Sequence, residues 1–435
     1  MTNIFKKILT PFLFAGAICF AHAQDSALLD ALAKKAILTE EEAAQIKKQM
    51  AEVKPLSENT RKIALSGRIN EQYLYLQSES ISPTRDVDDT YKGFKVRRLY
   101  IGTNSELGSG WSTNLTLNVV DGSDPSKMLA FAYARKQFEN DILTGYMDLG
   151  YTIEVFSFEE VTPSSVLLTI ERSPATRFFT GSQFTGAHRG CLGFGAYYTG
   201  AYWRWKFKSF PKLELGFTVT GTQNNTVKLP GPQYGSIPST WIKLIYADTA
   251  DFDGEKLSYE LGLNGGYGAE ANIADSSGCN SGIAGANPYV QIKYAQMIFW
   301  ADYITAHVER GRDDGAAAVP QGFNVTAEYR IPVDPIGEIA PIFRYSGLFT
   351  NGRGIRVRDA VSNIDDIIPL AGATAFYDNL TSIYGGINWY LRGHALKLQL
   401  GYEWIDFYGC VGDGASIPFK RAYVHAFRAQ LQVLF

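Results

Sequence analysis

The stretch FEEVTPSSVLLTIERSPATRF, from Phe158 to Phe178, holds the side chains of this chain that are best suited to chemistry. It combines two adjacent carboxylates, a cluster of hydroxyls and two arginines. The candidate residues are Glu159, Glu160, Thr162, Ser164, Ser165, Glu171, Arg172 and Arg177. Paired carboxylates can act as a general acid and base, and hydroxyls beside an arginine can hold an anion. The stretch is therefore a candidate active site, a candidate anion filter or a piece of scaffold.

The rest of the sequence gives catalysis no support. It has no nucleophile elbow, no glycine loop that would cradle a phosphate and no spacing that suggests a Ser-His-Asp arrangement. Cys191, Cys279 and Cys410 lie far apart, so metal-ligand spacing is absent, although one pair could bridge two loops. The acidic runs 85–90 and 251–255 lack a full series of calcium ligands. We therefore expect no enzymatic activity, no cofactor and no bound metal.

Residues 1–23 are typical of a cleaved secretory signal. Lys6 and Lys7 precede a long apolar run that ends in Ala21-His22-Ala23. The net charge of the whole chain is −3, and removal of the two leader lysines makes it about −5. Because the mature chain has no basic excess, a nucleic-acid partner is not indicated.

The segment 24–61 has a different composition, rich in helix formers. Leu28, Leu32 and Ala36 lie at helical spacing. Thr39 with Glu42 forms a capping box for a second helix. We expect two short helices on the periplasmic side, which act either as a spacer or as a self-association or cell-wall contact module.

From residue 62 to residue 435 the hydrophobic period is 2. In HALKLQLGYEW, leucine and aromatic side chains alternate with Lys397, Gln399 and Glu403. The whole chain contains 25 Tyr, 26 Phe and 7 Trp, and residues 24–435 hold no run of 18 apolar residues, so lipid contact must be spread over short strands. This pattern predicts an all-β fold, a transmembrane antiparallel β-barrel.

About 16 alternating segments occur in this region. They lie near residues 62–76, 92–105, 111–120, 127–138, 142–148, 189–208, 212–222, 239–247, 256–268, 288–294, 297–307, 321–331, 338–348, 381–391, 394–408 and 420–435. Short connections alternate with long ones, as in outer-membrane barrels with periplasmic turns and external loops. The third long connection, 149–188, carries an apolar run at 166–170 that an exposed loop would not need. We expect this loop to fold inward and narrow the pore.

The location of the protein follows from two further observations. A soluble β-sandwich would also alternate, but its outward face would be polar and its two loop sets would not differ in length. The final segment ends on Phe435, and a terminal aromatic on an alternating strand is similar to the signal that the barrel assembly machinery recognises. We therefore expect the outer membrane of a Gram-negative bacterium, with its lipid and lipopolysaccharide as partners.

Cations recur on the strand faces that should line the lumen. These candidates are Lys95, Arg97, Arg204, Lys206, Lys208, Lys243, Lys293, Arg330, Arg344, Lys397 and Arg428. The apolar side chains on either side of Arg97-Arg98 can share one face only if this pair holds a β-bulge, which turns both arginines inward. Opposed charges across a narrow pore select ions. The cations are either an anion track or general lumen polarity balanced by acids such as Glu214 and Glu403.

Three segments resemble one known family. FEEVTPSSVLLTIERS is similar to the central signature of the phosphate-selective porin O and P family, F-x-x-E-E-x-T-S-S followed by a hydrophobic run and E-R-S. Residues 92–119 resemble the family's Arg-rich strand and Gly-Trp turn, and residues 387–403 resemble its late NWY hairpin. The resemblance implies a 16-stranded barrel, usually a homotrimer, in which the third loop narrows the pore.

The same loop also departs from the family pattern. Residues 145–156 lack the basic residue and the proline that relatives carry before the signature, and 149–188 contains two arginines against four glutamates. A phosphate filter needs several cations and donors that converge on the ion. We expect a porin for passive diffusion of small hydrophilic solutes, with anions such as phosphate as candidates. The alternative is a structural or adhesive barrel that acts through its external loops.

Overall fold

The computed structural model describes residues 62–81, 87–120, 128–153, 155–181, 189–195, 197–221, 237–273, 280–361, 375–411 and 420–435. The expected signal at 1–23, the expected helices within 24–61 and Cys279 lie outside these ranges. In the described part of the chain, no helix is long and apolar enough to cross a membrane.

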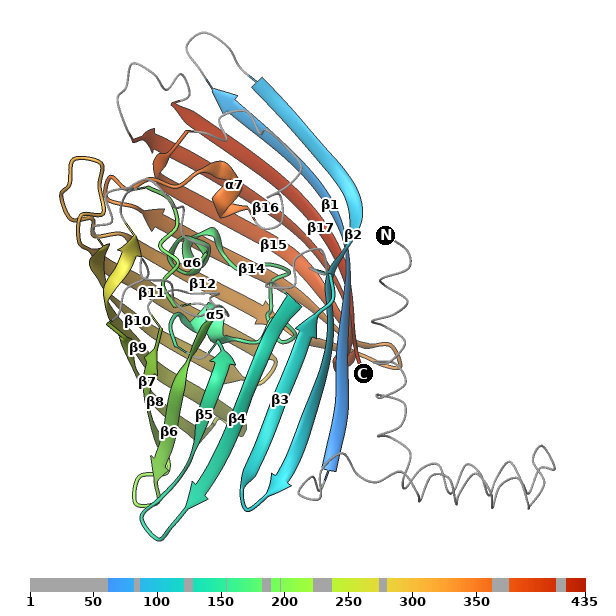
Figure 1. Cartoon of the computed structure of the whole chain (residues 1–435). Helices are drawn as coiled ribbons and strands as arrows, with labels where there is room; N and C mark the ends of the chain where they lie inside the picture. The colour runs from blue at the N-terminus through green and yellow to red at the C-terminus, as the bar shows by residue number, and fades with distance from the viewer. Residues whose placement is uncertain are drawn as a thin grey trace, which may run out of the picture.

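Strands make up most of the described residues (Figure 1). They are β1 (Lys62–Ile81), β2 (Val87–Gly108), β3 (Trp111–Asn118), β4 (Leu129–Glu139), β5 (Leu143–Thr152), β6 (Tyr198–Phe207), β7 (Leu213–Thr220), β8 (Ser239–Phe252), β9 (Glu255–Ile273), β10 (Asn280–Tyr294), β11 (Met297–Val308), β12 (Gln321–Tyr329), β13 (Ile331–Val333), β14 (Gly337–Phe349), β15 (Tyr377–His394), β16 (Leu396–Cys410) and β17 (Arg421–Leu434). All neighbours are antiparallel, and β1 pairs with both β2 and β17, so the sheet is closed. Because β12 and β13 both pair with β14, they share one place in a ring of sixteen strands. The predicted fold class is confirmed.

Side chains of the strands alternate between the outer surface and the lumen. On β16, Leu400 and Tyr402 are exposed outside, whereas Gln399 and Glu403 are buried on the lumen side. The outer face is thus apolar and the inner face polar, which is the arrangement required of strands that cross a bilayer around an aqueous interior.

The two ends of the barrel carry connections of different length. At one end the turns are tight: Asp253 and Gly254 join β8 to β9 with φ of 50° and 80°, which suits a type I′ hairpin turn. At the other end, the described parts of two long connections fold into the barrel: 153, 155–181, 189–195 and 197 after β5, and 350–361 and 375–376 after β14. The first contains α5 (Phe158–Val161) and α6 (Pro174–Thr180), and the second contains α7 (Val357–Ala360) (Figure 1).

The height of the wall varies around the barrel. β1 and β2 have 20 and 22 residues, whereas β3 and β7 have 8 each. Much of the predicted loop between β1 and β2 is paired strand, because backbone pairing continues through Ser78 and Ser80 after the hydrophobic alternation ends. The long strands therefore extend well beyond the short ones at the end of the long connections (Figure 1).

Apolar side chains are not confined to the lipid face of the barrel. The larger apolar cluster lies inside the barrel. It unites the two infolded connections with lumen-facing side chains of the wall. Its members include Phe156, Phe178, Phe179, Leu192, Phe194, Ile304, Ile355, Val357, Ile405 and Val424. The part of the lumen around the two infolded connections is therefore filled by a packed core, which holds both connections in place.

Candidate functional site: the constriction loop and the passage beside it

The constriction loop is residues 153–197, because β5 ends at Thr152 and β6 begins at Tyr198. The sequence placed it at 149–188 and began the next strand at 189. That boundary was wrong: Gly190, Gly193 and Gly195 have φ of 79°, 64° and 98°, which no extended strand adopts. The amides of Leu192 and Phe194 instead donate to the carbonyls of Phe178 and Phe179, so this segment folds back on α6.

The triplet Glu171-Arg172-Ser173 leads directly into α6. Ser173 is the N-cap, and its Oγ accepts a hydrogen bond of 3.1 Å from the amide of Thr176, while Pro174 follows at the first helical position. The amide and the Oγ of Ser173 also donate to one carboxylate oxygen of Glu159, at 2.9 and 2.7 Å. Glu159 therefore joins α5 to the start of α6.

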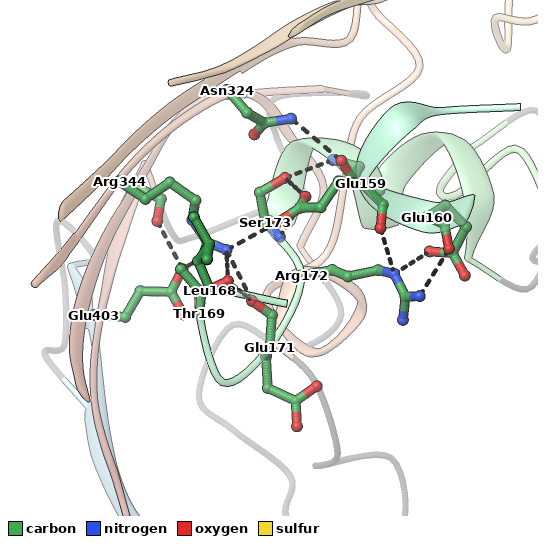
Figure 2. A network of polar contacts seen from close by, with 12 residues as sticks. Glu159, Glu160, Leu168, Thr169, Glu171, Arg172, Ser173, Asn324, Arg344 and Glu403 are labelled. Carbon is green, nitrogen blue, oxygen red and sulfur yellow. Dashed lines mark hydrogen bonds and ion pairs between the residues drawn. The ribbon is translucent and has the colours of Figure 1, made fainter. Parts of the chain in front are cut away.

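Arg344 on β14 connects this part of the loop to the wall (Figure 2). Its Nη1 lies 3.3 Å from Oε1 of Glu159 and donates to the carbonyl of Glu171 at 2.8 Å. Its Nη2 donates to Oε1 of Glu403 at 2.7 Å, and Arg428 donates to the other oxygen of Glu403 at 2.9 Å. All of these side chains are buried, so the loop is attached through an ion-pair network without access to bulk water.

Glu171 attaches the loop to β2. Arg97 donates two hydrogen bonds to its carboxylate, of 2.8 and 3.1 Å, and Arg98 lies 3.5 Å away. The strand register shifts here, with Asn70 opposite Arg98 but Glu71 opposite Val96, so the predicted bulge is present. Burial alone would raise the pKa of the Glu171 carboxyl, but the two arginines outweigh it and hold that pKa well below its usual range.

Arg172 and Glu160 stabilise the loop internally. Arg172 donates to the carbonyls of Glu159, Glu160 and Thr162, and its Nε lies 3.0 Å from the Glu160 carboxylate. Burial would lower the pKa of Arg172, but Glu160 raises it above its ordinary value. These two residues therefore stabilise the turn that follows α5 and leads to the hydroxyls of Thr162, Ser164 and Ser165 (Figure 2).

The apolar run of the loop lies against β15 and β16. Its carbonyls accept hydrogen bonds from buried wall side chains: Lys397 donates to Leu167 at 3.0 Å, and Asn388 donates to Leu168 at 2.8 Å. Leu167 and Leu168 are themselves buried in a second apolar cluster with Phe158. The run packs on the wall, and lumen-facing side chains of the wall donate hydrogen bonds to its backbone oxygens.

A junction joins the constriction loop to the connection 350–376. Arg177 donates to the carbonyl of Asp359 at 3.2 Å, and Arg353 donates to the carbonyl of Gly190 at 2.8 Å. Arg353 is completely buried, and burial lowers its pKa to about 10. Cys191 lies in the same junction as a free thiol, and burial raises its pKa to about 12. The sequence analysis did not identify Arg353, because its loop has no alternating pattern from which the direction of this side chain could be predicted.

The eleven cations predicted to line the pore fall into three groups, and Arg97, which pairs with Glu171, belongs to the paired one. Arg344, Lys397 and Arg428 are buried: the first two donate to carbonyls of the constriction loop, and Arg428 pairs with Glu403 on the wall. Several others are paired: Arg204 and Lys206 each lie 3.3 Å from Glu214, Lys208 lies 2.8 Å from Glu139, and Arg330 lies 2.9 Å from Glu328. Lys95 and Lys243 are half-buried, and Lys293 lines a polar cavity of about 470 Å³ with Asp248 and Glu260.

A passage remains between the constriction loop and the wall formed by β1 to β4. It contains a cavity of about 330 Å³, lined on the wall by Arg68, Tyr100 and Tyr133 and on the loop by Thr162, Ser164, Ser165, Arg172 and Tyr197. A second cavity of about 470 Å³ adjoins it toward the tight turns, and Asn114 and Tyr133 line both. Sequence reasoning missed Arg68 and Tyr100, although Arg68 lies on the same polar face as Asn70 and Gln72.

The arrangement offers no metal centre: among the residues that the structure describes, no three His, Cys, Asp or Glu side chains are grouped to hold a metal ion. Instead it combines a closed sixteen-stranded barrel, an infolded loop fixed by buried ion pairs and a polar passage beside that loop. These features define a porin-like fold.

Comparisons with known proteins agree on this fold. No family model matches the sequence, and no curated protein matches it. Among solved structures, an anion-selective porin from Comamonas acidovorans is 12% identical with a TM-score of 0.50, over 86% of this chain and 99% of that one. OmpF of Salmonella typhi (11% identity, TM-score 0.47) and the outer-membrane channel DcaP of Acinetobacter baumannii (12%, 0.47) each match over 87% of this chain and 99% of theirs. At such low identity the likeness concerns the fold.

Proposed function

We propose that this chain is an outer-membrane porin, a water-filled channel for passive diffusion of small hydrophilic solutes. The observation that carries the proposal is the pair of adjoining cavities inside the barrel, beside a loop that is fixed to the wall by Glu159 and Glu171. A loop held by buried ion pairs keeps a constant aperture, and such an aperture selects solutes by size and by field.

The charges around the loop favour anions. Two arginines, Arg68 and Arg172, line the cavity beside the loop, against one carboxylate, that of Glu160. The lining of the passage therefore carries an excess of one positive charge. Phosphate is the candidate anion that the resemblance to the phosphate-selective porin O and P family suggests.

The location and the assembly belong to the same proposal. The apolar outer face fits a bilayer, and Phe435 closes the barrel seam by exchanging two backbone hydrogen bonds with Gly67, of 2.8 and 3.1 Å. We infer a homotrimer in the outer membrane, inserted by the barrel assembly machinery and in contact with lipopolysaccharide. The segment 1–23 would be the signal, and the segment 24–61 would serve as a periplasmic spacer or a trimer contact.

Purified protein in a planar bilayer tests the function. We expect stepwise conductance, absent with heat-denatured protein, and a reversal potential under a KCl gradient that indicates anion preference. Silent bilayers after confirmed insertion would reject the channel in favour of a structural or adhesive barrel. A reversal potential that indicates cation preference would reject the proposed anion preference but leave the proposed channel intact.

Gels run in mild detergent test the assembly. If deletion of residues 24–55 dissociates the trimer, that segment serves in assembly. If the trimer persists, the segment serves as a spacer.

A further inference from the structure

We propose that the cavity beside Arg68 binds small monocarboxylates, and in particular those whose carboxylate is attached to a planar ring. The inference rests on the proposed function and names the class of solute that the passage recognises. It follows from three properties of the described residues: an open guanidinium, a single uncompensated charge and a lining of aromatic rings.

The guanidinium of Arg68 is held in place but incompletely paired. Arg68 is 8% exposed, and its CZ atom lies 4.3 Å from the centroid of the Tyr100 ring. Its Nε is buried and has no hydrogen-bond partner among the described residues. A buried charged donor without a partner is costly, and the planar edge of a guanidinium matches the two oxygens of a carboxylate. Arg68 lines the cavity, so an anion that enters it meets the rest of this guanidinium.

The neighbouring charges limit that anion to one negative charge. Arg172 is offset by Glu160 at 3.0 Å, and Arg98 shares Glu171 with Arg97. Among the described residues, Arg68 is thus the cation of this cavity that forms no ion pair with a carboxylate. The Glu160 carboxylate also lines the cavity, and it would repel a second negative charge on the solute. Divalent phosphate is therefore a poorer fit than a monocarboxylate.

Aromatic rings surround the rest of the cavity. Tyr100, Phe131, Tyr133 and Tyr197 line it, and the rings of Phe131 and Tyr197 lie 5.8 Å apart. Such rings offer flat apolar faces that stack on a planar ring, whereas an inorganic ion would leave those faces in contact with water. The volume of about 330 Å³ lies at the lower end of small-molecule sites and suits a single ring.

The test measures KCl current through single channels while one solute is added. The solutes are benzoate, cyclohexanecarboxylate, benzyl alcohol and inorganic phosphate, at equal concentration and at a pH where benzoate is ionised. We expect benzoate to reduce the current in a saturable manner, cyclohexanecarboxylate to act more weakly and benzyl alcohol to have no effect. Phosphate should require at least a tenfold higher concentration than benzoate.

Variants connect the effect to the cavity. Arg68→Gln should raise the half-blocking concentration of benzoate at least tenfold, and Arg68→Lys should give an intermediate value, because a lysine retains the charge but not the planar edge. The matched control is Arg421→Gln, because Arg421 is paired with Asp406 away from this cavity. Benzoate should block this variant at the same concentration as it blocks the wild type. Heat-modifiable mobility on gels shows that each variant is folded.

The outcomes separate the two proposals. KCl steps without benzoate block, equal block in Arg68→Gln, or stronger block by phosphate would overturn the inference and leave the porin intact. Absence of KCl steps from correctly folded, inserted protein would overturn the proposed function itself.

Discussion

Arg97 and Glu171 form a two-point ion pair, with Nε to Oε1 at 2.8 Å and Nη2 to Oε2 at 3.1 Å, that joins the bulge of β2 to the constriction loop. The bulge is what makes this pair possible. Without the extra residue, Arg97 and Arg98 would point to opposite faces, and only one of them could reach the loop.

Substitution Glu171→Gln should loosen the loop. It removes the carboxylate that Arg97 and the buried Arg98 share, and removal of one partner from a buried pair costs about 3–5 kcal/mol. We expect larger or noisier single-channel steps with an intact barrel. The control is Glu106→Gln, an exposed residue 3.9 Å from Lys62, which should conduct like wild type. Unchanged conductance in Glu171→Gln would show that the other attachments suffice.

The same carboxylate predicts a pH dependence. Its pKa is lowered in the folded loop, so its stabilisation is fully present above the unfolded value of about 4.3 and is lost as the pH falls below that value toward the folded pKa. Open-channel noise should be constant from pH 7 to pH 5 and should increase from pH 4 downward. Glu171→Gln should be noisy at every pH, and a wild-type transition near neutral pH would contradict this assignment.

Loss of Arg353 should open the loop junction. Arg353→Ala removes the donors to the carbonyls of Gly190 and Gly311 and leaves a cavity in the packed core. Cys191 reports the change, because a buried thiol with a raised pKa reacts slowly. In a Cys279→Ser, Cys410→Ser background, we expect a membrane-impermeant maleimide to label Cys191 at least tenfold faster in Arg353→Ala. Equal rates would show that the junction does not depend on this arginine.

The seam of the barrel should depend on Gly67. A Cβ at this position would overlap the ring of Phe435, so Gly67→Val must displace that ring from its place over β1. We expect a loss of about 1–3 kcal/mol, seen as a lower temperature for the heat-modifiable shift on gels. Gly385→Val is the matched control, since a Cβ at this strand glycine meets no atom within 4 Å. Equal transition temperatures would contradict a role for the ring contact.

The sequence predicted the barrel well, because strand periodicity is local. Alternation located a strand at each of the sixteen places in the ring, although not every boundary, and the conflict of register around Arg97 located the bulge. It could not predict which partner approaches each lumen-facing side chain. Glu159 and Arg344 are separated by 185 positions, and only the folded loop brings them to 3.3 Å. The end of β1 was also missed, since pairing beyond Leu76 relies on backbone hydrogen bonds and not on an apolar pattern.

The uneven wall affects how the barrel meets its surroundings. At about 3.4 Å per residue and a tilt near 40°, the 8 residues of β3 span about 20 Å, close to the apolar band of the bilayer, whereas the 20 residues of β1 span about 50 Å. The β1–β2 side therefore stands above the lipid as hydrogen-bonded sheet. An antibody or a bacteriophage that approaches the cell would meet this rigid ridge, and escape from such a ligand would require substitutions at exposed positions of the ridge, such as Ile81, without loss of strand pairing.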